Sequence, residues 1–370
     1  MHHDYSCAVI IGRFQPFHST HQALVEQALR IADKVLILVG SSHAARTPKN
    51  PFTFEERRQM IFDSMGVDIP GLPSGRIFVE PIRDFFYSDE VWLSQVQSVT
   101  SEYIEDGETV ALLGGYRDSS SYYLNLFPQW EYVAPTTLSK MDATQVREVL
   151  FDVTLGRTWG DRASEGVPTI TEEDTFSHTK HFNEMVPHTT MLFLESFRTT
   201  QAYGRLVEEF HANRAYRDAW ESAPFPPVFV TADAVVTCSG HVLVVKRGGN
   251  PGKGLLALPG GFVRSNERIK DAALRELKEE TRIKVDKLIL KSNIVTSAVF
   301  DYPGRSLRGR TVTHAFHVRL RDGKLPEVKG SDDAVGAFWL PLAEVFKREE
   351  EFFEDHLTII QKMIGGGLYG

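Results

Sequence analysis

The chain has 370 residues, of which 42% are hydrophobic and 24% are charged, an ordinary composition for globular proteins. Its length exceeds the size at which one hydrophobic core usually stops growing, so two domains are expected. A formal net charge of −8 argues against a general nucleic-acid-binding protein, which would normally carry a basic surface. Two cysteines exclude a disulfide framework, and neither a signal peptide nor an apolar run near the ~20 residues of a membrane span is present. We therefore expect a cytoplasmic protein that binds no membrane, and the composition is compatible with a monomer or a homo-oligomer.

The first 150 residues alternate between strand and helix patterns. Residues 7–11 are typical of a buried strand, a helical pattern follows at 21–33, and residues 34–42 form a second strand that ends in small residues. Further strands and helices continue this order to about residue 113. The alternation predicts an α/β, Rossmann-like parallel sheet with helices on both faces. Ligands bind at the carboxyl ends of such strands, so the loops after residues 11 and 40 are expected to carry the chemistry.

The chain changes character twice after residue 150. Residues of about 152–181 are polar and without periodicity, which indicates a loop or insert. Helical patterns return up to residue 220, and their aromatic residues are expected to pack between helices and not to form a base-stacking platform. The sequence APFPP then stiffens the chain, so we predict domains at 1–222 and 228–370 with a linker at 223–227. The strand patterns of the second domain surround one clear helix, which predicts a mixed α+β fold.

The segment GRFQPFHSTH places His18 and His21 after a strand and at the start of a helix. Unpaired N–H groups and the helix dipole favour an anion there, although histidines that only cap the helix are the alternative. The segment resembles the signature of the nucleotidylyltransferase superfamily, with Thr20 where that family usually has glycine. The segments at 42–60 and 139–147 resemble the nicotinamide mononucleotide (NMN) adenylyltransferase branch, and all three occur in that family's order.

This resemblance implies a reaction in which the phosphate of NMN attacks the α-phosphorus of the substrate ATP and gives NAD and pyrophosphate. It implies that the triphosphate is surrounded by Gly12, Arg13, Phe14, His18 and His21 and is also held by Thr144 and Arg147. It further implies that NMN is held by Asn50, Asp84 and Trp92. Catalysis then consists of alignment and charge neutralisation, which His18, His21, Arg147 and Mg²⁺ supply. The histidine motif recognises ATP and not the acceptor, so nicotinate mononucleotide or another phosphate ester stays an alternative.

The segment at 261–283 resembles the Nudix box. The residues that match the box stand at the family's spacing, and Arg282 stands where the family has a glycine. The matching residues are Gly261, Glu267, Arg275, Glu276, Glu279 and Glu280. A projection at about 100° per residue puts Glu276 and Glu280 on the apolar side, Glu279 at its border, and Arg275 mostly toward solvent. Inward carboxylates are costly unless they are paired or bind a metal, so we expect Glu276, Glu279 and Glu280 to hold Mg²⁺ or Mn²⁺. A solvated charged face is the alternative, and Glu267 and Arg275 are expected to brace the loop and helix.

Residues 300–316 resemble a segment of the ADP-ribose pyrophosphatase branch of the Nudix family. Arg305, Arg308 and Arg310 in this segment are expected to contact substrate phosphates, with solvent-exposed arginines as the alternative. The order of all the motifs resembles bacterial bifunctional NMN adenylyltransferase/Nudix proteins. It implies an enzyme that makes NAD from ATP and NMN and hydrolyses ADP-ribose to AMP and ribose 5-phosphate. A Nudix domain that only senses a ligand, as in some transcriptional regulators, is the rival interpretation.

Overall fold

The computed structural model describes residues 3–66, 75–115, 119–136, 143–152, 185–332 and 334–365. The chain divides into two compact units, Met1–Val207 and Glu208–Gly370. Most of the expected polar insert lies outside the described residues. Within the described residues, no helix is long and apolar enough to span a membrane.

The first unit is built on a five-stranded sheet in which every neighbouring pair of strands is parallel, in the order β3-β2-β1-β4-β5. The strands are β1 (Tyr5–Gly12), β2 (Ala32–Val39), β3 (Ile77–Pro81), β4 (Val110–Leu113) and β5 (Glu131–Val133). The middle of each central strand is buried because it is apolar on both faces, as in the successive residues Leu36 and Ile37 of β2. The strand order reverses at β1, so the carboxyl ends of β1 and β4 form the switch point at which such sheets bind ligands.

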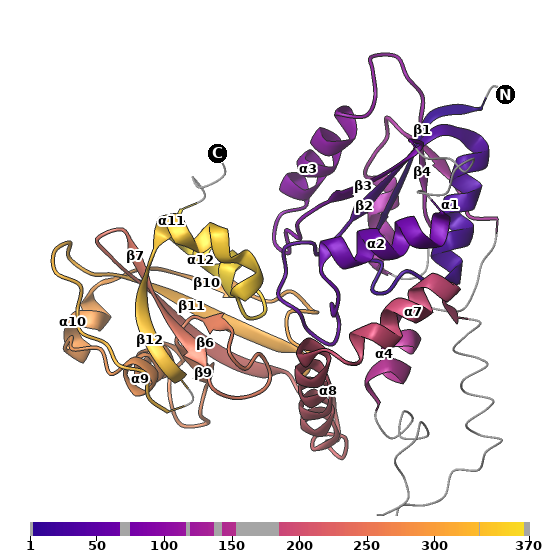
Figure 1. Cartoon of the computed structure of the whole chain (residues 1–370). Helices are drawn as coiled ribbons and strands as arrows, with labels where there is room; N and C mark the ends of the chain where they lie inside the picture. The colour runs from indigo at the N-terminus through magenta and orange to yellow at the C-terminus, as the bar shows by residue number, and fades with distance from the viewer. Residues whose placement is uncertain are drawn as a thin grey trace, which may run out of the picture. The chain divides into compact units, whose positions relative to one another are not determined.

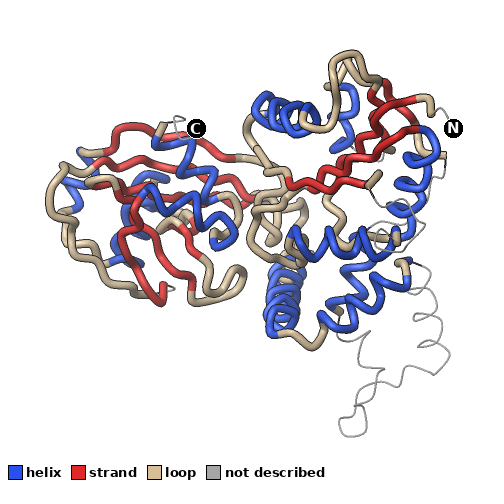
Figure 2. The backbone as a smooth tube through the Cα atoms, turned by 45° about the horizontal axis from the view of Figure 1, so that its top comes forward, coloured by secondary structure: helices blue, strands red, loops and turns tan. Residues whose placement is uncertain are grey.

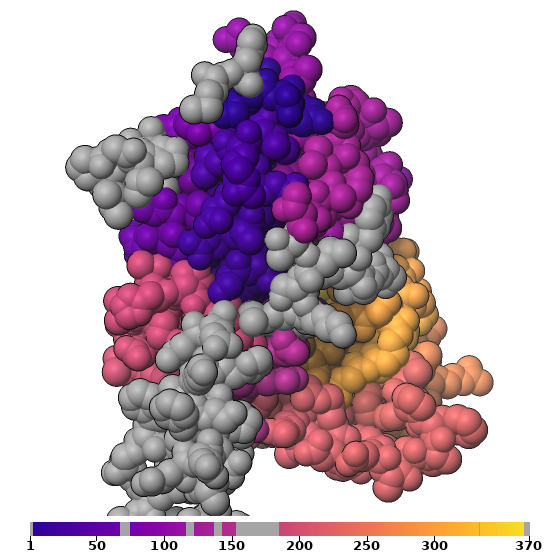
Figure 3. All heavy atoms as spheres, turned by 90° about the vertical axis from the view of Figure 1, so that its right-hand side faces the viewer, coloured from indigo at the N-terminus to yellow at the C-terminus, as the bar shows by residue number. Residues whose placement is uncertain are grey.

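Helices cover the sheet of the first unit, as Figures 1 and 2 show. They are α1 (Ser19–Ile31), α2 (Phe54–Met65), α3 (Asp89–Ser101), the 3-10 helix η1 (Ser119–Asn125), α4 (Ala143–Phe151) and α7 (His188–Phe197). Thr53 starts α2 with a capping box, in which its hydroxyl accepts the N–H of Glu56 and the Glu56 carboxylate accepts the N–H of Thr53. In the space-filling view, the indigo N-terminal residues form the middle of the visible face of this unit (Figure 3). The predicted parallel α/β fold is confirmed.

The second unit is a mixed α+β fold, as predicted. Its path of strands is β10-β11-β6-β7-β12, with β9 beside β6 and β8 beside β7, and only β6 and β11 pair in parallel. The strands are β6 (Phe229–Cys238), β7 (His241–Arg247), β8 (Leu256–Ala257), β9 (Gly260–Phe262), β10 (Ile294–Phe300), β11 (Thr311–Arg319) and β12 (Ala334–Pro341). The helices are α9 (Ile269–Thr281), α10 (Lys287–Ser292), α11 (Leu342–Val345), η2 (Phe346–Glu351) and α12 (His356–Ile364).

Helix α9 packs on β6 through Leu274 and Leu277, which lie in one buried cluster with Ala234 and Val236. Figure 1 shows α9 on one face of the sheet and α12 on the other. Helix α9 is the next element after β9, and Arg275 on the helix donates to the carbonyl of Phe262 at the end of that strand.

Helix α8 (Gln201–Asp218) contains the division between the two units. Its later residues pack with the second unit: the Glu209 carboxylate accepts the N–H of Gly252 at 3.1 Å, and the Arg217 guanidinium donates to the carbonyl of Leu307 at 2.9 Å. The division therefore lies earlier in the chain than 223–227. The domain limits that we predicted at 1–222 and 228–370 stay a prediction.

Candidate active sites

The loop after β1 brings the first predicted motif to the start of α1. Phe14 has a φ of 51° and turns its ring beneath Gly12, where an added Cβ would lie 3.1 Å from that ring. His18 caps α1, and its backbone N–H donates to Nδ1 of His21 at 3.3 Å. The two imidazoles stack with centroids 3.6 Å apart. Because Nδ1 of His21 accepts a hydrogen bond, the proton of the neutral ring lies on Nε2, which can donate to an anion.

The second motif meets this loop from α4. The Arg147 guanidinium donates to the carbonyl oxygen of Gln15 at 2.7 Å and to the hydroxyl of Thr144 at 3.2 Å. Arg147 is buried, and its guanidinium lies against the loop that carries the two histidines. The structure thus brings Thr144 and Arg147 to the loop that carries Gln15, three residues before His18.

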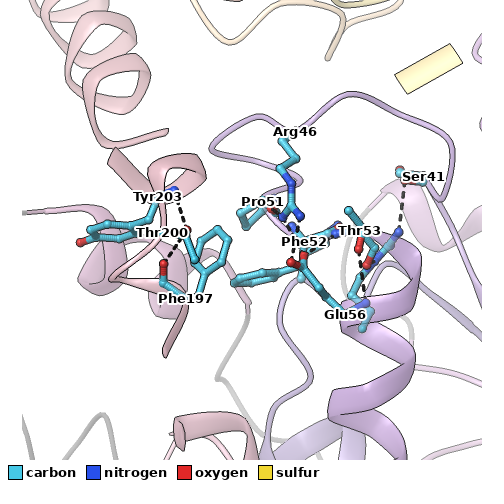
Figure 4. A network of polar contacts seen from close by, with 11 residues as sticks. Ser41, Arg46, Pro51, Phe52, Thr53, Glu56, Phe197, Thr200 and Tyr203 are labelled. Atoms are coloured by element: carbon cyan, nitrogen blue, oxygen red, sulfur yellow. Dashed lines mark hydrogen bonds and ion pairs between the residues drawn. The ribbon is translucent and has the colours of Figure 1, made fainter. Parts of the chain in front are cut away.

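The segment between β2 and α2 is fixed by two arginines. Arg46 donates to both carboxylate oxygens of Glu56, at 2.6 and 2.8 Å, and to the carbonyl of Pro51 at 2.6 Å (Figure 4). The ring of Phe52 packs edge-on against Phe197 of α7, with centroids 5.0 Å apart. These contacts tie the turn that carries Asn50 to α2 and α7.

The second arginine, Arg57, is fully buried and was not predicted as part of the site. Its guanidinium donates to the carbonyls of Arg13 at 2.8 Å, Gly40 at 2.6 Å and Ser41 at 3.3 Å. It therefore links α2 to the loops that follow β1 and β2. The sequence signal was weak because the acceptors are backbone groups, which carry no residue pattern.

The three residues expected to hold NMN lie around the same sheet edge. Asp84 follows β3 and accepts the hydroxyl of Ser41 at 2.6 Å. Trp92 on α3 contacts the ring of Tyr123 edge-on at 5.7 Å, and the Tyr123 hydroxyl donates to the carbonyl of Ile11 near the end of β1. The side-chain oxygen of Asn50 is buried without a hydrogen-bond partner among the described residues. A buried amide oxygen without a partner is costly, so it is suited to a donor from a ligand.

Lys49 is a further cation of this site that sequence reasoning missed. Burial lowers its pKa, the charges of Arg13 and Arg147 lower it further, and Asp84 opposes them. Its neighbour Asn50 was the only residue of this turn that the motif singled out. Together, Arg13, Lys49 and Arg147 place three positive charges near the helix start, a field that suits a polyphosphate.

In the second unit, the acids of α9 lie on the sides of the helix that the projection predicted, with Glu280 buried and Glu279 at the border. Glu280 is 8% exposed and buried, and the side chains of Glu276 and Glu279 are 15% and 36% exposed. The prediction that Arg275 points mostly toward solvent is wrong, because its side chain is only 13% exposed. Helical periodicity places a Cβ but does not show which partners a long side chain reaches.

Arg275 connects three of the acids. Its guanidinium donates to Glu267 at 2.6 and 3.0 Å, to Glu276 at 2.6 Å and to Glu279 at 2.8 Å. Glu267 also accepts the N–H of Arg264 at 2.9 Å. The hydrogen bonds from Arg275 lower the pKa of Glu267 to about 2. Glu267 and Arg275 thus brace the loop against the helix, while Glu276 and Glu279 are oriented by the same guanidinium.

Strand β9 closes over the two inward acids. The N–H of Gly260 donates to the Glu280 carboxylate at 3.0 Å, and a Cβ at Gly261 would lie 2.6 Å from Oε1 of Glu276. Burial raises the pKa of Glu280 to about 8 and also raises the pKa of Glu276. Neighbouring carboxylates that are shielded from water are a donor set that suits a hard divalent cation. The residues present therefore fit the predicted metal.

The three arginines of the 300–316 segment do not share one environment. The expectation for Arg305 differs from the structure: its guanidinium is 2% exposed and donates to both oxygens of the buried Asp355, at 2.7 and 3.0 Å. Arg308 lies over the ring of Phe262 at 5.2 Å. Arg310 donates to the carbonyl of Asp301. Of these three arginines, Arg308 is the one that contacts Phe262, the residue after Gly261.

Two further acids of this unit were not predicted. Asp233 on β6 is buried, accepts the hydroxyl of Thr313, and has a pKa raised to about 6 by burial. Asp355 is grouped with Glu354 and His356 in metal-like spacing. However, Asp355 is engaged by Arg305, and Nδ1 of His356 accepts the N–H of Leu258 at 2.9 Å. We therefore assign this group to packing of the sheet against α12.

Comparisons with known proteins match both units. The NUDIX domain model covers residues 228–363, and the cytidylyltransferase-like model covers residues 9–71. The nicotinamide/nicotinic acid mononucleotide adenylyltransferase of Acinetobacter baylyi is 33% identical over 205 residues, 55% of this chain and 93% of that protein. The ADP-ribose pyrophosphatase of Methanocaldococcus jannaschii is 33% identical over 133 residues, 35% of this chain and 72% of that protein.

Solved structures match nearly the whole chain. One of them is a bifunctional NMN adenylyltransferase/ADP-ribose pyrophosphatase from Francisella tularensis, crystallised with AMP and a manganese ion. It is 33% identical, with a TM-score of 0.85, and the match covers 97% of this chain and 98% of that one. The chain therefore belongs to the family of bifunctional NMN adenylyltransferase/Nudix ADP-ribose pyrophosphatases.

Proposed function

We propose that this protein is a bifunctional enzyme of NAD metabolism. Its first unit transfers AMP from ATP to NMN, which gives NAD and pyrophosphate. Its second unit hydrolyses ADP-ribose to AMP and ribose 5-phosphate. Support comes from the full-length match to a bifunctional structure and from two separate sites whose residues suit phosphate chemistry.

For adenylyl transfer, the carrying observation is the hydrogen bond between Arg147 and Gln15, which holds the late motif against the histidine loop. A phosphate oxygen of NMN attacks the α-phosphorus of ATP, and the bond to the leaving pyrophosphate breaks. His21 donates from Nε2, and Arg147 and the start of α1 neutralise charge on the phosphoryl oxygens. Mg²⁺, when bound to the triphosphate, adds to this neutralisation. No side chain forms a covalent bond, so the residues act by alignment.

Asn50 is the residue that bears on the choice of acceptor. Its buried oxygen suits an amide donor, which the carboxamide of NMN has and the carboxylate of nicotinate mononucleotide lacks. This observation favours NMN. The Acinetobacter relative is named for both acceptors. Assays with equal concentrations of the two acceptors measure the preference as a ratio of kcat/KM.

For ADP-ribose hydrolysis, the carrying observation is the pair of buried acids, Glu276 and Glu280, beneath β9. We propose that Glu276, Glu279 and Glu280 hold Mg²⁺ or Mn²⁺. Such a cation, when bound, neutralises the diphosphate and polarises water. Arg275 holds Glu276 and Glu279 in place, and the Gly260 N–H holds Glu280. Water adds to one phosphorus, one P–O bond of the diphosphate breaks, and the two monophosphates leave.

One crossed experiment tests both halves. The full chain is given ATP, NMN and Mg²⁺ and, separately, ADP-ribose and Mg²⁺. We expect Arg147→Ala to abolish NAD formation and keep ADP-ribose hydrolysis, and Glu280→Gln to do the reverse. Each variant is then the folding control for the other. Absence of NAD from the unmodified protein would refute the first half, and ADP-ribose binding without turnover would instead support the ligand-sensor interpretation.

A further inference from the structure

One edge of the second unit carries a cation-rich surface that has no part in either proposed reaction. Residues 282–293 and 319–329 contain eight lysines and arginines against three acids, in a chain whose net charge is −8. We call these two stretches the basic surface. Its eight cations are all exposed; they are Arg282, Lys284, Lys287, Lys291, Arg319, Arg321, Lys324 and Lys329.

Backbone hydrogen bonds join the two stretches of the basic surface. The N–H of Lys284 donates to the carbonyl of Glu327 at 3.0 Å, and the N–H of Arg319 donates to the carbonyl of Asn293 at 3.0 Å. Figure 1 shows α10, the helix within this surface, beside α9 at an edge of the second unit. The cations of the two stretches therefore lie close together in space.

The protein itself neutralises little of this charge. In the described part of the chain, Lys291 alone of the eight cations forms an ion pair, with Asp271 at 3.5 Å. Two of the three acids, Asp286 and Asp322, accept backbone N–H groups at 2.7 and 3.0 Å. A surface with a net positive charge on an otherwise acidic protein attracts an anionic partner.

Two aliphatic side chains project from the middle of the basic surface. Leu288 is 76% exposed and Ile289 is 52% exposed, whereas Leu290 on the same helix is buried and anchors it. Helix α10 is held at both ends, because the Asp286 carboxylate caps it and the Asn293 amide donates to the carbonyl of Ile289 at 2.7 Å. The helix therefore keeps two apolar side chains in water, and a partner that covers them gains free energy.

Arg282 is a second, independent sign that the positive charge has a role. It stands where the Nudix box usually has a glycine, and its φ of 44° is in the left-handed region that favours glycine. A residue with a Cβ is disfavoured in this conformation. The needs of the turn therefore do not account for an arginine here, whereas contact with an anionic partner does.

Projecting aliphatic residues among cations fit an anionic lipid surface. Lysines and arginines attract anionic headgroups, while side chains such as Leu288 and Ile289 enter the boundary between headgroups and acyl chains. Nucleic acid fits less well, because the basic surface contains no aromatic residue on which a base could stack. A second copy of the chain that bound through the same surface would bring like charges together.

We propose that the basic surface binds the second unit to anionic membranes, with Leu288 and Ile289 as the inserted residues. The expectation that the chain binds no membrane rests on the lack of an apolar run long enough to span one. Binding at the membrane surface needs no such run. The proposal is independent of both proposed reactions and gives the eight cations no role in catalysis.

Co-sedimentation of the full chain with lipid vesicles tests the proposal. The chain is expected to bind vesicles in which about a third of the lipid is phosphatidylglycerol, and not vesicles of phosphatidylcholine alone. Raising the salt from about 0.1 M to about 1 M should release most of it, because the Debye length falls from about 10 Å to about 3 Å. Dissolved glycerol 3-phosphate, which has the charge of a headgroup but forms no surface, should not compete.

A charge-reversing variant tests the cations. Lys287→Glu changes the charge by two units and is expected to weaken binding to the anionic vesicles at least about tenfold, since each basic residue contributes roughly fivefold near such a membrane. Lys347→Glu is the matched control, because the side chain of Lys347 is 69% exposed but lies on η2, outside the basic surface. It should bind the vesicles nearly as well as the unmodified chain.

A second variant tests the inserted side chains without a change of charge. Leu288→Gln is expected to weaken binding at least about fivefold, because a polar side chain gains little from leaving water. Leu192→Gln, at a leucine of α7 that is 51% exposed, is the control and should not weaken it. All four variants should unfold at the temperature of the unmodified chain, since each changes an exposed side chain.

The proposal is overturned if the unmodified chain binds neither kind of vesicle, or if Lys287→Glu binds the anionic vesicles as tightly as Lys347→Glu. It is also overturned if Leu288→Gln binds them as tightly as Leu192→Gln, because the aliphatic residues would then not insert. Retention of the chain on polyuridylate but not on the vesicles would show that the partner is a nucleic acid.

Discussion

The guanidinium of Arg147 lies 2.7 Å from the carbonyl oxygen of Gln15, and this hydrogen bond joins two motifs that are 132 residues apart. A lysine at position 147 keeps the charge but cannot donate to Gln15 and Thr144 together. We expect Arg147→Lys to lower kcat for NAD formation by at least about 10-fold, below the roughly 10²–10³-fold loss typical of removing such a donor. Arg30→Lys, at an exposed position late in α1, is the control for the same exchange. Equal rates for Arg147→Lys and the unmodified chain would show that charge alone is needed.

Arg57 predicts a loss of stability. Its buried guanidinium is satisfied by carbonyls at the ends of β1 and β2, so Arg57→Met leaves several of them without a donor. We expect the free energy of unfolding of the first unit to fall by about 3 kcal/mol, as for other broken buried networks. Arg58→Met is the matched control, because the neighbouring Arg58 is about half exposed and pairs only loosely with Glu55. Urea denaturation measures both, and indistinguishable midpoints would contradict the assignment.

Gly261 predicts a loss of activity without unfolding. A methyl group there would lie 2.6 Å from Oε1 of Glu276, the same oxygen that accepts from the Arg275 guanidinium. We expect Gly261→Ala to displace that carboxylate, to weaken Mn²⁺ binding and to reduce ADP-ribose hydrolysis at least about 10-fold. Gly249→Ala, where an added methyl group meets no atom, should change neither. Mn²⁺ binding followed by electron paramagnetic resonance separates loss of the metal from loss of the fold.

Glu267 predicts a dependence of stability on pH. Hydrogen bonds from Arg275 depress the pKa of this acid to about 2 in the folded chain, below its ordinary value. A carboxyl group whose pKa is depressed on folding stabilises the folded state at pH values above its pKa in the unfolded chain. This contribution is lost as the pH falls toward 2. Glu267→Gln should therefore destabilise the second unit most at pH 6–8 and progressively less below about pH 4. Thermal unfolding at fixed ionic strength tests this, with the exposed Glu351→Gln as control. A deficit that is constant with pH would indicate lost packing in place of lost charge.

The parts of the site that the sequence predicted are those whose geometry is local. The spacing of His18 and His21 placed both rings at one helix start, and the spacing of Glu276 and Glu280 placed both on the inner face of α9. Both follow from the helical period, which is set by the backbone.

The parts that it missed depend on contacts between distant segments. Arg275 reaches Glu267 in the preceding loop, and Arg57 reaches carbonyls of two strand ends, so neither burial follows from periodicity. The partner of Arg305 lies 50 residues away, at Asp355, which no motif marks. Side-chain reach and backbone acceptors become visible only once the chain is folded.

Helix α8 has one further consequence, for any attempt to obtain the two activities as separate proteins. Tyr203, early in this helix, donates to the carbonyl of Leu150, whereas Glu209 accepts the amide of Gly252. A gene divided at the proline-rich segment would give a C-terminal product that lacks the acceptor for that amide. Division ahead of the helix would deprive the N-terminal product of the tyrosine instead. Because one helix supplies contacts to both units, division of the gene is disfavoured. Synthesis and breakdown of dinucleotides therefore stay in a single polypeptide.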